Sequence, residues 1–189
     1  MRNTSAVILA LFTVVACDPP EGVDQNDNED QEGQSALANL EGEALDLSQG
    51  WGEAKACVVW QGAVECFREE SDADAWIQYI DEEAGSTSLA APSSAPSLAC
   101  SRECLHLYAH NGFNGRHLHF CDRGFWQNLG TYNFNDQLSS YKTGVRGVHL
   151  ARDHHGQGNW YPGDTSACTA ISQMNNGWND EVSSIWINK

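Results

Sequence analysis

The chain has 189 residues and a formal net charge of −16. Residues 18–100 contain nineteen acids and two bases, whereas residues 101–189 contain seven of each. This charge argues against a nucleic-acid-binding protein, because such proteins need a basic face that displaces counterions from phosphates. A multi-pass membrane protein is excluded too, since the one long apolar run, residues 6–16, is about half the length of a bilayer span.

The first 17 residues have the layout of a bacterial export signal. Arg2 precedes an apolar stretch, and small residues follow it. The segment Val14-Val15-Ala16-Cys17 resembles a lipobox, in which the cysteine is acylated and the chain is cleaved before it. The sequence therefore predicts an exported protein that is lipid-anchored through Cys17 at the bacterial cell envelope, with simple secretion as the alternative.

Composition divides the rest of the chain into four parts. Residues 18–50 are acidic and poor in large apolar side chains, which predicts a disordered tether. Residues 51–84 are predicted to form a small element of one hairpin and one helix, and residues 85–98 form a Ser/Pro/Ala linker. Residues 99–189 have short strand-like runs separated by Gly, Asn and Asp, which predicts an all-β domain. The small element cannot build its own core, so we expect it to dock on this domain or to act as a pro-segment.

Six cysteines remain if Cys17 carries lipid, and an even number in an exported chain suggests three disulfides. They are Cys57, Cys66, Cys100, Cys104, Cys121 and Cys168. A hairpin that turns at Gln61-Gly62 places Cys57 opposite Cys66 in a non-hydrogen-bonded pair, where close Cα atoms suit a disulfide. The same symmetry about Gly112-Phe113 favours Cys104 with Cys121 and leaves Cys100 for Cys168. The sequence leaves the other pairings of these four open.

A helix is expected after the hairpin. Ser71 to Asp74 form a capping-box pattern. Ala73, Trp76, Ile77 and Ile80 then recur at helical spacing, which predicts one apolar face that packs on another element.

The C-terminal part contains an internal repeat. Residues 134–140 (FNDQLSS) recur as residues 178–184 (WNDEVSS), at an offset of 44. Upstream, residues 107–115 align with residues 150–158 at an offset of 43. Two features at nearly the same offset indicate a tandem duplication of one β unit.

Both copies resemble the calcium motif of βγ-crystallin domains, [ND]-[ND]-x-x-[ST]-S, at every fixed position. Tyr108, Phe113 and Gly115 are similar to the aromatic hairpin signature that opens each Greek key in that family. Ala151 and Gly156 replace the aromatics in the second repeat, which predicts a less well packed second hairpin. The resemblance implies an all-β domain of two Greek-key motifs that form a βγ-crystallin-like β-sandwich.

The resemblance also implies that the two motif loops lie side by side and share about two Ca²⁺ ions. Calcium takes six to eight oxygen ligands in flexible geometry, and such loops supply them with micromolar to sub-millimolar affinity. Each ion would meet one backbone carbonyl, one hydroxyl and one side chain of the opposite loop: Gln137, Ser139 and Asn179 for one ion, and Glu181, Ser183 and Asn135 for the other.

Four further motif residues belong to these loops, and two of them, Asp136 and Asp180, are counted in the predicted calcium site. Asp136 and Asp180 would shape the loops by Asx-type hydrogen bonds and would add negative potential. Ser140 and Ser184 would point inward and hydrogen-bond.

Histidine and tryptophan offer weaker candidates. His117 and His119 alternate with apolar residues, which favours a solvated pair over a zinc or copper site. Most tryptophans are predicted to pack in the core or against loops, whereas residues 160–163 are a candidate aromatic loop for a glycan or protein partner.

No nucleophile elbow, phosphate loop or acid–base pair occurs in the sequence, so we expect a non-enzymatic protein. The leading interpretation is a calcium-binding domain of an exported lipoprotein, which contacts membrane only through its anchor. Alternatives are a secreted metallopeptidase inhibitor of crystallin-like fold and an adhesion or matrix module that binds a surface polymer.

Overall fold

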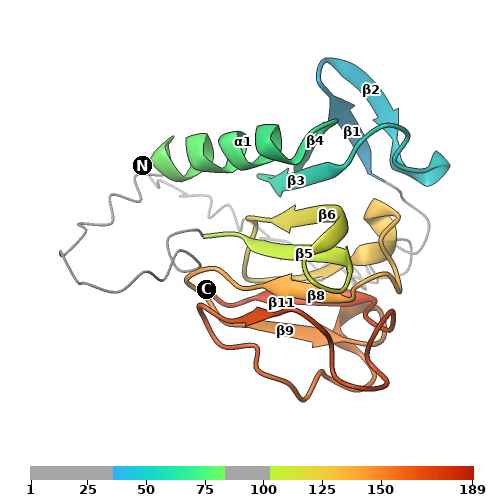
Figure 1. The fold of residues 1–189 in the computed structure, drawn as a ribbon, viewed down its shortest axis with the longest axis vertical. Helices are drawn as coiled ribbons and strands as arrows, with labels where there is room; N and C mark the ends of the chain where they lie inside the picture. Colours follow the sequence, from blue (N-terminus) through green and yellow to red (C-terminus); the bar gives the residue numbers. More distant parts are fainter. Residues whose placement is uncertain (1–35, 84–102) are drawn as a thin grey trace, which may run out of the picture. The chain divides into compact units, whose positions relative to one another are not determined.

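The computed structural model describes residues 36–83 and 103–189. The predicted export signal with Cys17, the first part of the tether and the linker over residues 85–98 lie outside these ranges. The described residues form an eight-stranded sheet and a three-stranded sheet (Figure 1). Within these ranges, we find no helix with the length and apolar character that crossing a bilayer requires.

The C-terminal part forms seven strands. They are β5 (Leu105–His110), β6 (Asn114–Phe120), β7 (Trp126–Asn128), β8 (Ser140–Lys142), β9 (Val148–Ala151), β10 (Ala170–Ile171) and β11 (Ser184–Ile187). One sheet contains β10, β8, β5 and β6 in that order, and the other contains β7, β11 and β9. Each repeat therefore contributes one strand to the sheet of the other, because β7 pairs with β11 and β10 pairs with β8. This exchange joins the two Greek keys into the predicted β-sandwich.

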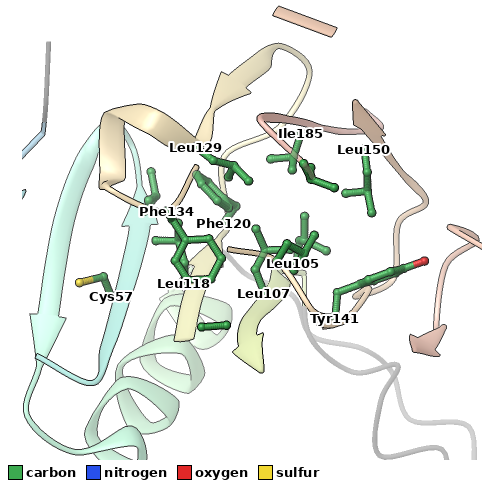
Figure 2. Packing of buried hydrophobic residues seen from close by; sticks show 14 of the residues in the cluster. Cys57, Leu105, Leu107, Leu118, Phe120, Leu129, Phe134, Tyr141, Leu150 and Ile185 are labelled. Atoms are coloured by element: carbon green, nitrogen blue, oxygen red, sulfur yellow. The ribbon is translucent and has the colours of Figure 1, made fainter. Parts of the chain in front are cut away.

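The core lies between the two sheets. Figure 2 shows Leu105, Leu118 and Phe120 of the larger sheet together with Leu150 and Ile185 of the smaller one. All five side chains are buried. Burial of each side chain stabilises the fold by about 1.5–3 kcal/mol, because its apolar surface is removed from water. The core thus fixes both sheets, and with them the loops that join their strands.

The N-terminal segment extends the larger sheet. It comprises β1 (Leu37–Leu40), β2 (Glu43–Asp46), the 3₁₀ helix η1 (Leu47–Gln49), β3 (Ala56–Trp60), β4 (Ala63–Phe67) and α1 (Glu70–Glu83). Strand β3 runs parallel to β6, and the sheet continues through β4, β1 and β2. The expected docking of this element on the C-terminal domain is confirmed, and it occurs by strand addition.

The prediction of a disordered tether over residues 18–50 is wrong for its last part, where β1 and β2 form a hairpin. Ala38, Leu40 and Leu47 are buried in the main core. The hairpin turns at Gly42, whose φ of +96° suits glycine. The hairpin contains few apolar side chains within a mostly acidic segment, so the average composition of residues 18–50 did not reveal it.

Both disulfides that the described residues contain were predicted. Cys57 is paired with Cys66 in the expected strand register, with Cα atoms 4.0 Å apart. Cys104 is bonded to Cys121 with a Cα separation of 4.2 Å. Cys168 is disulfide-bonded as well, whereas Cys100, its expected partner, lies outside the described ranges. These bonds brace the hairpin β3–β4 and the ends of β5 and β6.

Helix α1 confirms the predicted apolar face but not the predicted start. Ala73, Ile77 and Ile80 are buried against the outer face of the larger sheet. The helix begins at Glu70, so Ser71 lies inside the first turn and does not cap it. Acidic side chains in this turn favour the helix terminus through its dipole.

The prediction that His117 and His119 face solvent is wrong, because α1 covers this face of the sheet. His117 Nδ1 lies 3.0 Å from Glu70 Oε1 of α1, without hydrogen-bond geometry. His119 Nδ1 lies 2.7 Å from His106 Nδ1. Strand alternation shows which side chains share a face, but it does not show what covers that face.

We predict that acid destabilises the chain through His117. Burial lowers the pKa of His117 below its ordinary 6.5, and Lys142 lowers it further, against the opposing charges of Glu70 and Asp74. As pH falls, His117 is therefore protonated in the unfolded chain before it is protonated in the folded chain. The free energy of unfolding should decrease as pH drops below about 6.5 and level off below the folded-state pKa. Between about pH 8 and pH 5, the unfolding temperature of His117→Gln should fall less steeply with decreasing pH than that of the unaltered chain. Equal slopes for both proteins would contradict this role.

Candidate functional site

The two motif loops face each other through a pair of symmetric backbone hydrogen bonds. Asp136 N donates to Val182 O at 3.2 Å, and Asp180 N donates to Leu138 O at 3.0 Å. Both aspartates have left-handed backbone, with φ of +53° and +57°. Leu138 and Val182 are also buried in the core, so the sandwich holds both loops in place.

The last serine of each motif ties its loop to the hairpin of the same repeat. Ser140 Oγ donates to His110 O at 2.6 Å and accepts from Phe113 N at 3.0 Å. Ser184 Oγ donates to Asp153 O at 2.6 Å and accepts from Gly156 N at 2.9 Å. The predicted inward-facing role of both serines is confirmed.

Serine hydroxyls and carboxylates of opposite loops meet in the site. Ser139 Oγ donates to Asp180 Oδ1 at 3.0 Å, and Ser183 Oγ lies 3.3 Å from Asp136 Oδ1. Sequence had placed Asn179 and Asn135 in these cross-loop positions and had given the aspartates Asx-type bonds. In the structure, the carboxylates of Asp180 and Asp136 make the cross-loop contacts, and the assignment of the two asparagines as calcium ligands stays a prediction.

The two asparagines orient the carboxylates that follow them. Asn135 Nδ2 donates to Asp136 Oδ2 at 2.7 Å, and Asn179 Nδ2 donates to Asp180 Oδ2 at 2.6 Å. Each carboxylate is thus held by an amide of its own loop and a hydroxyl of the other. The pairing could not be read from spacing within one motif, because it depends on how two motifs meet.

Several oxygen atoms in these loops have no hydrogen-bond donor among the described residues. Asn135 Oδ1 is buried and has no partner there. The backbone carbonyls of Gln137 and Glu181 likewise accept no hydrogen bond within the described ranges. A buried unpaired oxygen costs about 1–3 kcal/mol, which a cation or a water molecule can offset. The oxygens present therefore fit a hard cation such as calcium.

A cleft of about 290 Å³ opens beside the loops. Its lining includes both cross-loop carboxylates and consists of Ala109, His110, Arg116, Asp136, Gln137 and Asp180. In the described ranges, no group of three or more His, Cys, Asp or Glu side chains is arranged to hold a metal. Any cation here would rely on carbonyl, hydroxyl and amide oxygens beside the carboxylates.

Comparison with protein-family models finds no match, and comparison with curated proteins finds none either. Solved structures do resemble the chain. A nickel complex of a clostrillin double mutant is 22% identical, covering 46% of this chain and 98% of its own at a TM-score of 0.39. A βγ-crystallin domain from Flavobacterium johnsoniae is 26% identical over 44% of this chain and 91% of its own, with a TM-score of 0.35. A βγ-crystallin from Ciona intestinalis is 22% identical over 45% and 99%, with a TM-score of 0.37.

Two Greek keys that exchange strands and bring both motif loops together are the arrangement that the motif resemblance implied. Residues 103–189 have the βγ-crystallin fold. The N-terminal strands and helix are additions to this domain, since they continue its larger sheet beyond β6.

An arginine contacts the third residue of each motif in this domain. Arg116 donates to the Gln137 side chain, and burial lowers the pKa of Arg116. Arg152 Nη1 lies 3.7 Å from Glu181 Oε2, and its guanidinium lies 4.7 Å from the centre of the Trp178 ring. Sequence reasoning missed both arginines because they lie outside the two calcium motifs and at no fixed position of the hairpin signature.

The second hairpin is better packed than its sequence predicted. Tyr108 and Phe113 of the first hairpin contact each other at 5.4 Å between ring centres, as the signature implies. In the second hairpin, the ring of Trp126 lies directly against Gly156, where a side chain would overlap it. Trp126 also contacts Trp160 at 5.5 Å. An aromatic from a neighbouring strand thus fills the space that the missing aromatics leave.

The tryptophan predictions hold in part. Trp178 is buried, as expected, and Tyr161 is buried beneath the candidate aromatic loop. Trp160 is 51% exposed, so it is the one ring of that loop that reaches solvent.

Proposed function

We propose that the βγ-crystallin domain binds about two calcium ions between its motif loops. The observation that carries this proposal is the pairing of each motif hydroxyl with a carboxylate of the opposite loop. The proposed ligand sets keep the carbonyls and hydroxyls that sequence indicated and exchange asparagine for aspartate: Gln137, Ser139 and Asp180 for one ion, and Glu181, Ser183 and Asp136 for the other, with Asn135 Oδ1 as a further ligand.

Calcium would act in this site as a structural cross-link. Asp136 and Asp180 border the same cleft, so a cation would offset their mutual repulsion. Carboxylate, hydroxyl and carbonyl oxygens favour calcium over softer transition metals, which prefer imidazole and thiolate. Because each ion takes ligands from both repeats, binding would stabilise the two Greek keys against each other.

The proposed setting is the bacterial cell envelope. The export signal and Cys17 support a lipid-anchored protein, which we propose is non-enzymatic, and the disulfides of the folded part suit an oxidising compartment. The acidic segment after Cys17 would separate the folded part from the membrane surface.

Thermal unfolding of residues 18–189 in calcium and in chelator tests the proposal. Calcium at about 100 times its dissociation constant should stabilise the chain by about 2.7 kcal/mol per site. The double variant Ser139→Ala plus Ser183→Ala should lose this stabilisation, because each ion loses its hydroxyl ligand. Ser166→Ala removes an exposed hydroxyl elsewhere and should respond like the unaltered chain. Unfolding temperatures that calcium leaves unchanged would contradict the proposal.

A further inference from the structure

The N-terminal segment is hydrogen-bonded to the stretch of chain that precedes the first motif loop. Three hydrogen bonds join the two: Ala36 N to Thr131 O at 2.7 Å, Asn133 Nδ2 to Leu47 O at 2.9 Å, and Trp51 Nε1 to Tyr132 O at 2.8 Å. These bonds span the 3₁₀ helix η2 (Leu129–Tyr132) and its left-handed C-cap, Asn133. The backbone that delivers the first motif is therefore fixed by residues outside the βγ-crystallin domain.

Trp51 lies at the centre of this contact. Its side chain is 3% exposed, and its ring centre lies 5.9 Å from that of Phe134, the residue before the motif. The guanidinium of Arg116 lies 5.1 Å from the centre of the Trp51 ring and donates to the Gln137 side chain. Gln137 Nε2 in turn donates to Asn133 O at 3.1 Å. A continuous set of contacts thus runs from Trp51 to the residue whose carbonyl is a proposed calcium ligand.

The second loop is supported differently. Its counterpart of Phe134 is Trp178, which packs against Arg152 of the same domain. Arg152 also donates to Gly177 O and pairs with Glu181. Among the described residues, no hydrogen bond or ring contact joins the N-terminal segment to this second loop. The two proposed calcium sites are therefore unequally supported.

We infer that residues 36–51 act as a brace, which holds the first loop in place and raises its calcium affinity. Calcium binding and docking of residues 36–51 then strengthen each other. The inference rests on the proposed calcium function. A loop held in its binding conformation before the ion arrives loses less conformational freedom on binding, and this raises affinity. Coupling of this kind is reciprocal, so calcium should also tighten the contact between the segment and the loop.

Calcium titration of residues 18–189 with and without Trp51→Leu tests the brace. The variant loses the bond to Tyr132 O, the contact with Phe134 and the ring beneath Arg116. We expect about tenfold weaker binding of the ion held by Gln137 and Ser139, and a smaller loss for the other ion, which takes Asp136 but no carbonyl or hydroxyl from the first loop. Trp76→Leu is the control, because it makes the same change in α1, outside residues 36–51. It should bind calcium like the unaltered chain. Trp51→Phe keeps a ring and loses the hydrogen bond, so it should weaken binding by about threefold.

Hydrogen exchange provides the reciprocal test and does not depend on Trp51→Leu being folded. Calcium should slow amide exchange over residues 36–51 in the unaltered chain. If Trp51→Leu and Trp51→Phe bind both ions with unaltered affinity, or if calcium leaves exchange of this segment unchanged, the brace is overturned and the proposed function stands. If the unaltered chain binds no calcium, both are overturned.

Discussion

Replacing Asp136 and Asp180 together with asparagine should abolish calcium binding. Each carboxylate meets the motif hydroxyl of the opposite loop, so the double change removes the charged ligand of both proposed sites. Asparagine tolerates the left-handed backbone at both positions, and the loops should therefore keep their conformation. We expect affinity to fall by about 100-fold or more, equivalent to about 3 kcal/mol per site.

Asp164→Asn is the matched control for this loss of charge. Asp164 is exposed and accepts a hydrogen bond from Ser166 N, away from the motif loops. This variant should bind calcium like the unaltered chain. Tight calcium binding by the double variant would show that the aspartates are not ligands. Asn135 and Asn179, which the sequence had indicated, would then be the candidate side-chain ligands.

Gly156→Ala should produce the largest loss of stability among single changes in the second hairpin. Gly156 has a φ of +75°, and a side chain there would overlap the ring of Trp126. The left-handed backbone costs about 1–2 kcal/mol for alanine, and displacement of the packed ring adds about 1–3 kcal/mol. Urea unfolding should show the resulting drop of about 3 kcal/mol in the free energy of unfolding.

Gly177→Ala separates the two contributions. Gly177 has a similar φ of +78°, and no atom lies within 4 Å of the position of a Cβ. This variant should therefore show the backbone cost alone, about 1–2 kcal/mol. Equal losses for both variants would mean that Trp126 moves aside freely and that it does not complete the packing of the second hairpin.

Much of this fold was predictable from the sequence, because these features depend on interactions between residues that are close together in the chain. The register of the hairpin that contains Cys57 and Cys66 follows from a two-residue turn and the alternation of a strand. The twin motifs and their spacing identified the two Greek keys, and the buried Ser140 and Ser184 behave as their positions imply.

Contacts between distant segments were not predictable in the same way. Besides Ala109 O, the Ser139 hydroxyl contacts Asp180, 41 residues away, and one motif alone does not reveal this contact. Trp51 lies in a segment without any motif, and Arg116 only follows the hairpin signature, yet both meet the first loop. One missed feature did carry a local signal, since Gly42 separates two short leucine-containing runs that form β1 and β2.

A calorimetric titration of calcium into metal-free residues 18–189 tests the central claim most directly. The paired loops predict about two ions bound, with two distinguishable affinities because only the first loop is braced. The heat should disappear in the double variant Asp136→Asn plus Asp180→Asn. A titration of the unaltered chain that shows no heat and no saturable binding would contradict the account, and the motif loops would then be turns that serve the fold alone.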